Sequence, residues 1–213
     1  VHWLLKANGW KNLRVNKKKF IYLISPNTIY KKFFKDLLKV LETRKVCIFQ
    51  LRLKKYSFKD KILIGQKIKN ICKKNKVKFL INDDPILALK LGADGCHLGQ
   101  KDMNIKKARK ILKNKIIGIT CHNSVKLAKI ALDNNANYLA FGAFNNSKTK
   151  KTRYKAKINI IHSIKKMTKI PVVAIGGINA KNYKKLLLNK ANFLAISSYV
   201  WRNKKLSPVE AIR

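Results

Sequence analysis

A repeat runs through this chain: short apolar segments alternate with segments of helical periodicity, and one such unit occupies roughly 24 residues. The apolar segments are continuous runs rather than apolar–polar alternations, which is typical of strands covered on both faces. Eight of them occur, at residues 20–24, 46–51, 79–81, a run ending near His97, 115–119, 138–141, 171–175 and 193–196. The repeat predicts an α/β fold, a single-domain (β/α)8 TIM barrel, rather than an open doubly wound sheet, which would need fewer strands or a topological switch point.

The segments between the strands carry matching helix signals. Pro85 is suited to the first turn of a helix, and Gly92 is suited to end the same helix. Helices are predicted at residues 30–41, 59–73, 85–91, 105–112, 124–134, 158–167 and 180–188. Residues 143–155 lack apolar periodicity and predict a long loop. Residues 1–19 precede the first repeat, and we expect them to be an N-terminal extension to a barrel of residues 20–213.

The acidic residues are concentrated in one window. Only nine Asp and Glu occur among 213 residues, and four of them, Asp83, Asp84, Asp94 and Asp102, lie between residues 77 and 102. Asp83 follows the third predicted strand and Asp102 the fourth, so we expect both at the mouth formed by the carboxyl ends of parallel strands. Asp84 and Asp94 are expected to be structural, as a helix N-terminal charge and a turn residue.

A polar and cationic segment, QLRLK, follows the second predicted strand. Because side chains alternate along an extended chain, Gln50, Arg52 and Lys54 share one face and the intervening leucines take the other. Asn82 ends the third strand and reaches the same mouth. The barrel lumen is therefore expected to receive two amides and two cations.

Carboxylates beside these cations favour a metal–diphosphate site. Mg2+ takes one or two protein carboxylates and completes its shell with phosphate oxygens and water. Asp83 and Asp102 are therefore the predicted ligands of Mg2+ that bridges a diphosphate.

A second group of anion-binding signals follows the sixth, seventh and eighth strands. Loops after the last two strands of such barrels commonly hold a phosphate monoester through backbone N–H and hydroxyl donors. The candidates are Ser147, Thr149 and Lys150 in the long loop, Gly177 in a Gly-Gly turn, and Ser197 and Ser198 after the eighth strand. Two anion sites, one for a diphosphate with metal and one for a monophosphate, predict a transferase that joins two phosphorylated small molecules.

Charge and cysteine usage limit the other classes. Fifty Lys and Arg give a net charge of +41, but they are spread along the whole chain, which argues against specific nucleic-acid binding. No run approaches the ~20 apolar residues of a membrane span. The four cysteines show no CxxC spacing, so we expect reduced core thiols and a reducing, cytoplasmic location. Zinc is disfavoured because adjacent Cys and His residues point to opposite strand faces.

In order and spacing, several motifs resemble the thiamine-phosphate synthase family. They are QLRLK, the ND at residues 82–83, GADGCHLGQKD, GITCH, the SKTK of residues 147–150, PVVAIGGI and AISS. The resemblance covers roughly residues 20–199. It implies a (β/α)8 barrel that condenses 4-amino-2-methyl-5-(diphosphooxymethyl)pyrimidine with thiazole phosphate, giving thiamine phosphate and diphosphate by a dissociative mechanism with Mg2+ as cofactor.

The resemblance also implies roles for residues, with Arg52, Lys54 and Lys150 acting on the leaving diphosphate. The pyrimidine diphosphate would be bound by Gln50, Arg52, Lys54, Asn82, Thr120 and Lys150, Mg2+ by Asp83 and Asp102, and thiazole phosphate by Ser147, Thr149, Gly177, Ser197 and Ser198. Thr120 and Ser147 replace the family's more usual Ser and Thr and keep the hydroxyl, Ala143 stands where Pro is frequent, and Lys190 stands where Gly often ends a helix.

Two alternatives remain open at this point. A sister family, the thiazole tautomerases, shares the barrel and uses a His near the end of strand five, a part that His122 could play. A Lys-rich barrel could also act mainly by binding polyanions such as nucleic acid. Homo-oligomer formation is possible in each case.

Overall fold

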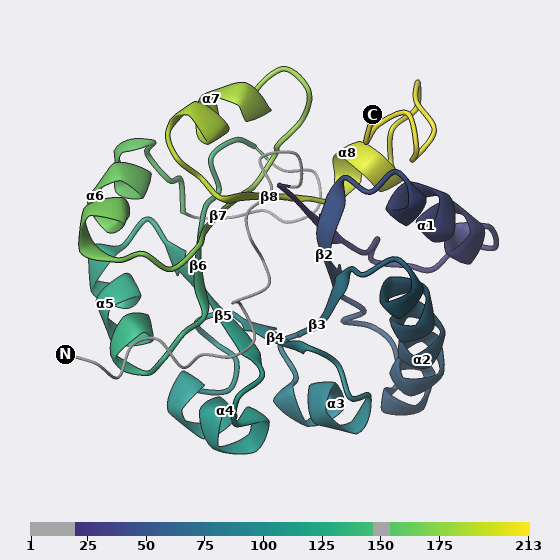
Figure 1. Cartoon of the computed structure of the whole chain (residues 1–213), viewed down its shortest axis with the longest axis horizontal. Helices are drawn as coiled ribbons and strands as arrows, with labels where there is room; N and C mark the ends of the chain where they lie inside the picture. The colour runs from purple at the N-terminus through teal and green to yellow at the C-terminus, as the bar shows by residue number, and fades with distance from the viewer. Residues whose placement is uncertain (1–19, 147–153) are drawn as a thin grey trace.

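The computed structural model describes residues 20–146 and 154–213, and these form a closed barrel of eight parallel strands surrounded by helices (Figure 1). Each strand pairs with its neighbours in sequence, and β8 pairs with β1 to close the ring. The strands are β1 (Ile21–Ile24), β2 (Val46–Leu51), β3 (Lys78–Asn82), β4 (Gly95–Leu98), β5 (Ile116–His122), β6 (Tyr138–Phe141), β7 (Val172–Ile175) and β8 (Phe193–Ile196). The helices are α1 (Phe33–Glu42), α2 (Phe58–Lys74), α3 (Pro85–Lys90), α4 (Ile105–Leu112), α5 (Val125–Asp133), α6 (Asn159–Met167), α7 (Tyr183–Leu188) and α8 (Ser198–Trp201).

Two apolar clusters fill the molecule on either side of the strand ring. The larger one packs the outer faces of the strands against the helices, with Leu23, Phe49 and Ile81 among its members. The smaller one fills the lumen and includes Tyr22, Ile48 and Leu80 from the alternate positions of the same strands. Both faces of every strand are thus covered, which explains the continuous apolar runs in the sequence.

Side-chain caps begin several of the helices at the residues that the sequence signals indicate. The Asp84 carboxylate accepts a hydrogen bond from the Leu87 N–H at 2.9 Å, directly before Pro85 at the start of α3. Ser57, Asn104 and Ser124 cap α2, α4 and α5 in the same way. These side chains satisfy backbone N–H groups that have no partner within the helix. The structural role predicted for Asp84 is therefore observed.

The larger differences between the observed and the predicted elements are at one strand and three helices. Strand β5 continues to His122 instead of ending at residue 119, so Thr120 belongs to the strand. Helices α1 and α7 begin at Phe33 and Tyr183, each three residues later than expected, and the four-residue α8 was not predicted. The N-terminal extension, residues 1–19, lies outside the described residues, so the division at residue 20 remains a prediction.

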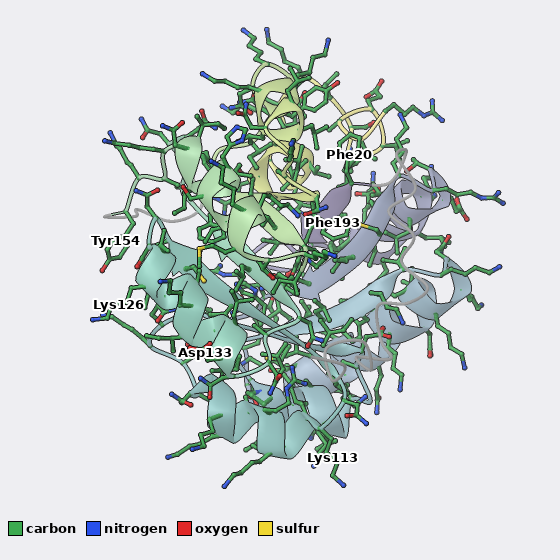
Figure 2. All side chains as sticks on the ribbon, turned by 60° about the vertical axis from the view of Figure 1, so that its left-hand side comes forward. Phe20, Lys113, Lys126, Asp133, Tyr154 and Phe193 are labelled. Carbon is green, nitrogen blue, oxygen red and sulfur yellow. The ribbon has the colours of Figure 1, made fainter. Side chains whose placement is uncertain are left out.

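Basic side chains project around the perimeter of the molecule, including the labelled Lys113 and Lys126 (Figure 2). Between the described residues, two Lys–Asp ion pairs are formed, Lys54–Asp83 and Lys78–Asp94, each with a separation of 2.8 Å. None of the helices in the described ranges is long and apolar enough to cross a membrane.

We expect binding to nucleic acid to be non-specific and sensitive to salt. Dispersed cations attract phosphates through counterion release, an effect that weakens steeply as salt concentration rises. Fluorescence anisotropy with a random-sequence duplex should show binding at low salt and loss of most of it at ~200 mM salt. Affinity that persists at the higher concentration would instead indicate a specific polyanion site.

The turn after α7 contains a residue in a conformation that suits glycine. Lys190 has a φ of 68°, and the N–H groups of Lys190 and Ala191 bond back to Leu187 and Leu186. We therefore expect Lys190→Gly to raise the free energy of unfolding by roughly 1 kcal/mol, because a side chain in the left-handed region is strained. Denaturant titration measures the change.

The matched control for this prediction is Lys185→Gly. Lys185 is an exposed lysine within α7, where glycine should lower stability by roughly 1 kcal/mol instead. Opposite signs for the two substitutions are expected, and equal losses would show that the turn is not strained.

Candidate active site

An ion pair and a second carboxylate meet at the carboxyl ends of β2, β3 and β4. The Lys54 Nζ atom lies 2.8 Å from Asp83 Oδ2, directly after β3. Asp102 follows β4 in a tight turn, in which its Oδ2 accepts a 2.7 Å hydrogen bond from the Gly99 N–H. The carboxyl groups of Asp83 and Asp102 are hydrogen bonded to each other. These three side chains therefore come together, as the sequence predicts.

The two carboxyl groups have opposite pKa shifts. At Asp102, burial, the hydrogen bond to Asp83 and the negative charge of Asp83 raise the pKa. At Asp83, burial acts in the same direction, but the hydrogen bonds with Asp102 and Lys54 and the charge of Lys54 outweigh it and lower the pKa. Of the two groups, Asp102 is therefore the one that takes up a proton more readily. A divalent cation between the two groups would offset the repulsion between their negative charges.

The donor set limits the kind of cation that fits here. Within the described ranges no three His, Cys, Asp or Glu side chains form a group that could hold a metal. Two carboxylates are too few for a protein-only Ca2+ or Zn2+ site, but they suit Mg2+, which takes its other ligands from substrate and water.

Gln50 and Asn82 lie side by side at the top of the lumen, while Arg52 turns toward the first strand. The Gln50 Nε2 atom donates a 2.5 Å hydrogen bond to Asn82 Oδ1, and Gln50 is buried. Arg52 lies beyond the end of β2, and its Nη1 donates to Asn27 Oδ1 at 2.7 Å. Asn27, in the loop after β1, was not identified from the sequence. Its only signal was its position directly after a strand.

Thr120 reaches the lumen from β5 and contacts a buried histidine. The Thr120 hydroxyl lies 2.8 Å from His97 Nε2, and His97 Nδ1 lies 2.8 Å from the Tyr138 hydroxyl. Burial lowers the pKa of His97 to about 4, although the charge of Asp83 acts in the opposite direction, so the imidazole is neutral near pH 7. Sequence reasoning missed His97 and Tyr138, although His97 sits within the quoted GADGCHLGQKD motif.

A cavity of about 500 Å³ borders the acid–cation group on its outer side. Lys54, Asn82 and Asp83 line it together with Lys61 from α2 and Met103. Lys61 is a further cation that sequence reasoning did not single out, because it lies within a helix that carries many lysines.

The second predicted anion site is only partly within the described residues. Gly177 has a φ of 60°, and a Cβ atom there would lie 2.3 Å from the Asn146 carbonyl oxygen, so the loop after β6 packs closely on the Gly-Gly turn. Ser197 follows β8, the neighbour of β7, and its hydroxyl donates to the Ser25 carbonyl oxygen at 3.1 Å. Ser198 begins α8 and is half-buried. Ser147, Thr149 and Lys150 lie outside the described residues.

His122, the candidate for the tautomerase alternative, ends β5 with a φ of 53°. Its ring stacks on Tyr154, with 4.0 Å between ring centroids and 21° between planes. Tyr154 lies at the outside of the molecule (Figure 2). His122 is thus packed against a residue of the segment between β6 and α6.

Comparisons with known proteins show the family to which the chain belongs. Residues 21–200 match the family model described as "Thiamine monophosphate synthase". The chain is 64% identical over 204 residues to a thiamine-phosphate synthase of Pelagibacter ubique, covering 95% of this chain and 98% of that protein. It is 37% identical to a thiamine-phosphate synthase of Erythrobacter litoralis, covering 90% and 92%. The solved structure of thiamine phosphate pyrophosphorylase from Pyrococcus furiosus matches with a TM-score of 0.81 and 29% identity, covering 93% of each chain.

The match spans the whole barrel and includes both groups of strand-end residues. It was expected from the motifs and is independent of the geometry described above. The chain therefore belongs to the thiamine-phosphate synthase family, transferases of thiamine biosynthesis.

Proposed function

We propose that this chain condenses 4-amino-2-methyl-5-(diphosphooxymethyl)pyrimidine with thiazole phosphate to give thiamine phosphate and diphosphate. The contact of Lys54 with Asp83, and of Asp83 with Asp102, carries the proposal. This group combines two metal-ligating carboxylates with a cation at one end of the barrel, which is the combination that a leaving diphosphate requires.

Asp83 and Asp102 would hold Mg2+ in this proposal. The interaction of the two carboxyl groups and the raised pKa of Asp102 support the assignment, because a divalent ion would offset the repulsion between two neighbouring carboxylates. When bound, Mg2+ supplies neutralisation of the negative charge on the diphosphate oxygens.

The chemistry that remains is electrostatic, and the chain's own residues perform it. The bond between the pyrimidine methylene and the diphosphate oxygen breaks, and both electrons leave with diphosphate. Arg52, Lys54 and Lys150 would stabilise this developing charge, and the thiazole nitrogen then supplies its lone pair to the methylene carbon. Stabilising a leaving anion by preorganised cations needs no protein nucleophile.

The pyrimidine would lie over Gln50, Asn82 and Thr120. These side chains surround the top of the lumen, and the hydrogen bond between Gln50 and Asn82 holds both amides in fixed orientations. A planar ring above them would place its methylene substituent toward Lys54 and Asp83.

Thiazole phosphate would be bound on the opposite side of the mouth by Ser147, Thr149, Gly177, Ser197 and Ser198. The left-handed turn at Gly177 and the start of α8 beside it support this part of the proposal, since backbone N–H groups at such positions suit phosphate.

Two further expectations accompany the proposal. The four cysteines are buried thiols, which is consistent with a reducing compartment such as the cytoplasm. The tautomerase alternative has less support, because His122 is packed against Tyr154 and the named relatives are synthases.

The test compares two chemically identical substitutions at opposite ends of the barrel. We expect Asp83→Asn to lower kcat/KM for thiamine phosphate formation roughly 100-fold, because the diphosphate loses its charge stabilisation. Asp94→Asn is the matched control. Asp94 also pairs with a lysine at 2.8 Å, but it does so before β4, at the amino ends of the strands, and should leave the rate within about threefold.

Thermal denaturation provides a readout that does not depend on turnover. Mg2+ with inorganic diphosphate should raise the melting temperature of the parent and of Asp94→Asn, but not that of Asp83→Asn. Equal stabilisation of all three proteins, or equal rates, would remove Asp83 from the proposed site.

A further inference from the structure

A hydrogen-bonded network crosses the barrel lumen beneath the site, from β5 to β3. It consists of five hydrogen bonds of 2.5 to 2.8 Å. In order along the network, the residues are Thr120, His97, Tyr138, Tyr22, Gln50 and Asn82. Three of them, Thr120, Gln50 and Asn82, are proposed substrate ligands, whereas the other three lie below the mouth.

The middle of the network is fully buried. Tyr22 and Tyr138 are among the largest buried side chains, and burial raises the pKa of both hydroxyls, so each keeps its single proton. Gly118 provides the space, because a Cβ atom there would lie 1.8 Å from Tyr138 Cζ. The tyrosine ring therefore crosses the lumen directly over a residue without a side chain.

The position of one amide determines the direction of the whole network. Gln50 presents Oε1 to Tyr22 and Nε2 to Asn82, so the Tyr22 hydroxyl must donate to Gln50. The bond between the two tyrosines then uses the Tyr138 proton. Because each hydroxyl has only one proton, Tyr138 can only accept from His97 Nδ1.

The same reasoning extends to the mouth. His97 is buried, and its two ring nitrogens are hydrogen bonded to the hydroxyl groups of Tyr138 and Thr120 rather than to a carboxylate, which suits a neutral imidazole. With the proton on Nδ1, Nε2 is unprotonated, so the Thr120 hydroxyl donates to it. At the other end, Asn82 Oδ1 accepts from Gln50. Thr120 is thus left with oxygen lone pairs for a ligand, and Asn82 is left with N–H donors.

We propose that His97, Tyr138 and Tyr22 are positioning residues that set substrate specificity by fixing Thr120 as a hydrogen-bond acceptor and Asn82 as a donor. The inference rests on the proposed function for the identity of the ligand. An aminopyrimidine presents N–H donors from its exocyclic amino group and acceptors at its ring nitrogens, which complement this arrangement. A 4-oxo analogue presents an acceptor in place of the amino group, which opposes the Thr120 lone pairs.

The first experiment observes the network directly. Imidazole 15N chemical shifts distinguish a proton on Nδ1 from a proton on Nε2, and the chain has only four histidines, so the His97 signals can be assigned by comparison with His97→Gln. We expect the neutral Nδ1–H tautomer in the wild-type protein. The Nε2–H tautomer would overturn the proposal, since the network would then run in the opposite direction.

The second experiment measures selectivity as the ratio of kcat/KM for the 4-amino and 4-oxo pyrimidine diphosphates. The wild-type ratio should be roughly 10- to 100-fold in favour of the amino compound. Tyr138→Phe keeps the ring but removes the hydroxyl that orients His97, so the ratio should fall by roughly 10-fold although Tyr138 is not a proposed ligand. Ile116→Val, a lumen substitution outside the network, should retain the wild-type ratio.

Each outcome has a distinct meaning. Unchanged selectivity in Tyr138→Phe would overturn the proposal, and Tyr22→Phe provides the same test if Tyr138→Phe does not fold. Failure of the wild-type protein to use the amino substrate would instead contradict the proposed function. The 15N measurement needs no substrate and separates the two failures.

Discussion

Alternation of side chains along the parallel strands determines how this molecule is filled and where its chemistry can occur. On each strand, one set of residues faces the helices and the other faces the lumen, which produces the two separate apolar clusters. The polar residues of the mouth belong to the same lumen-facing series of positions and lie at the carboxyl ends of the strands. Gln50 lies two residues after Ile48, and Asn82 two residues after Leu80. Gln50 pairs with Leu80 in the register of β2 and β3, so the change from apolar to polar occurs two residues later on β3.

Electrostatics gives the few carboxylates an importance that they would not have in an average protein. With a net charge of +41, anionic substrates are attracted from every direction, which favours encounter but provides no orientation. The orientation of a bound substrate must be set by a local group in which positive and negative side chains occur together. Asp83, held by Lys54 and interacting with Asp102, is such a place.

Much of the barrel could be predicted from the sequence, because its strands are continuous apolar runs and its helices have caps and periodicity. The charged corner was also predictable, since Asp83, Asp102 and Lys54 occur at strand ends. Tyr22 and Tyr138 were not, because an aromatic residue in an apolar run indicates only burial. Their contact joins positions 116 residues apart, and it depends on the space left by Gly118.

Other differences between prediction and structure have local causes. The end of β5 carries polar residues, so Thr120 resembled the start of a loop although it still pairs with Ala140 of β6. Helix α8 is only four residues long and is too short to show periodicity. The orientation of Arg52 toward Asn27 depends on the course of a loop, which strand alternation does not determine.

The pairing of β8 with β1 has a consequence for the behaviour of the protein in concentrated solution. Short apolar strands rich in Ile, Val and Phe are templates for aggregation when a sheet ends with exposed N–H and C=O groups. Here each of the eight strands in the described ranges has a partner on both sides, so this ring offers no terminal strand onto which another chain could be added.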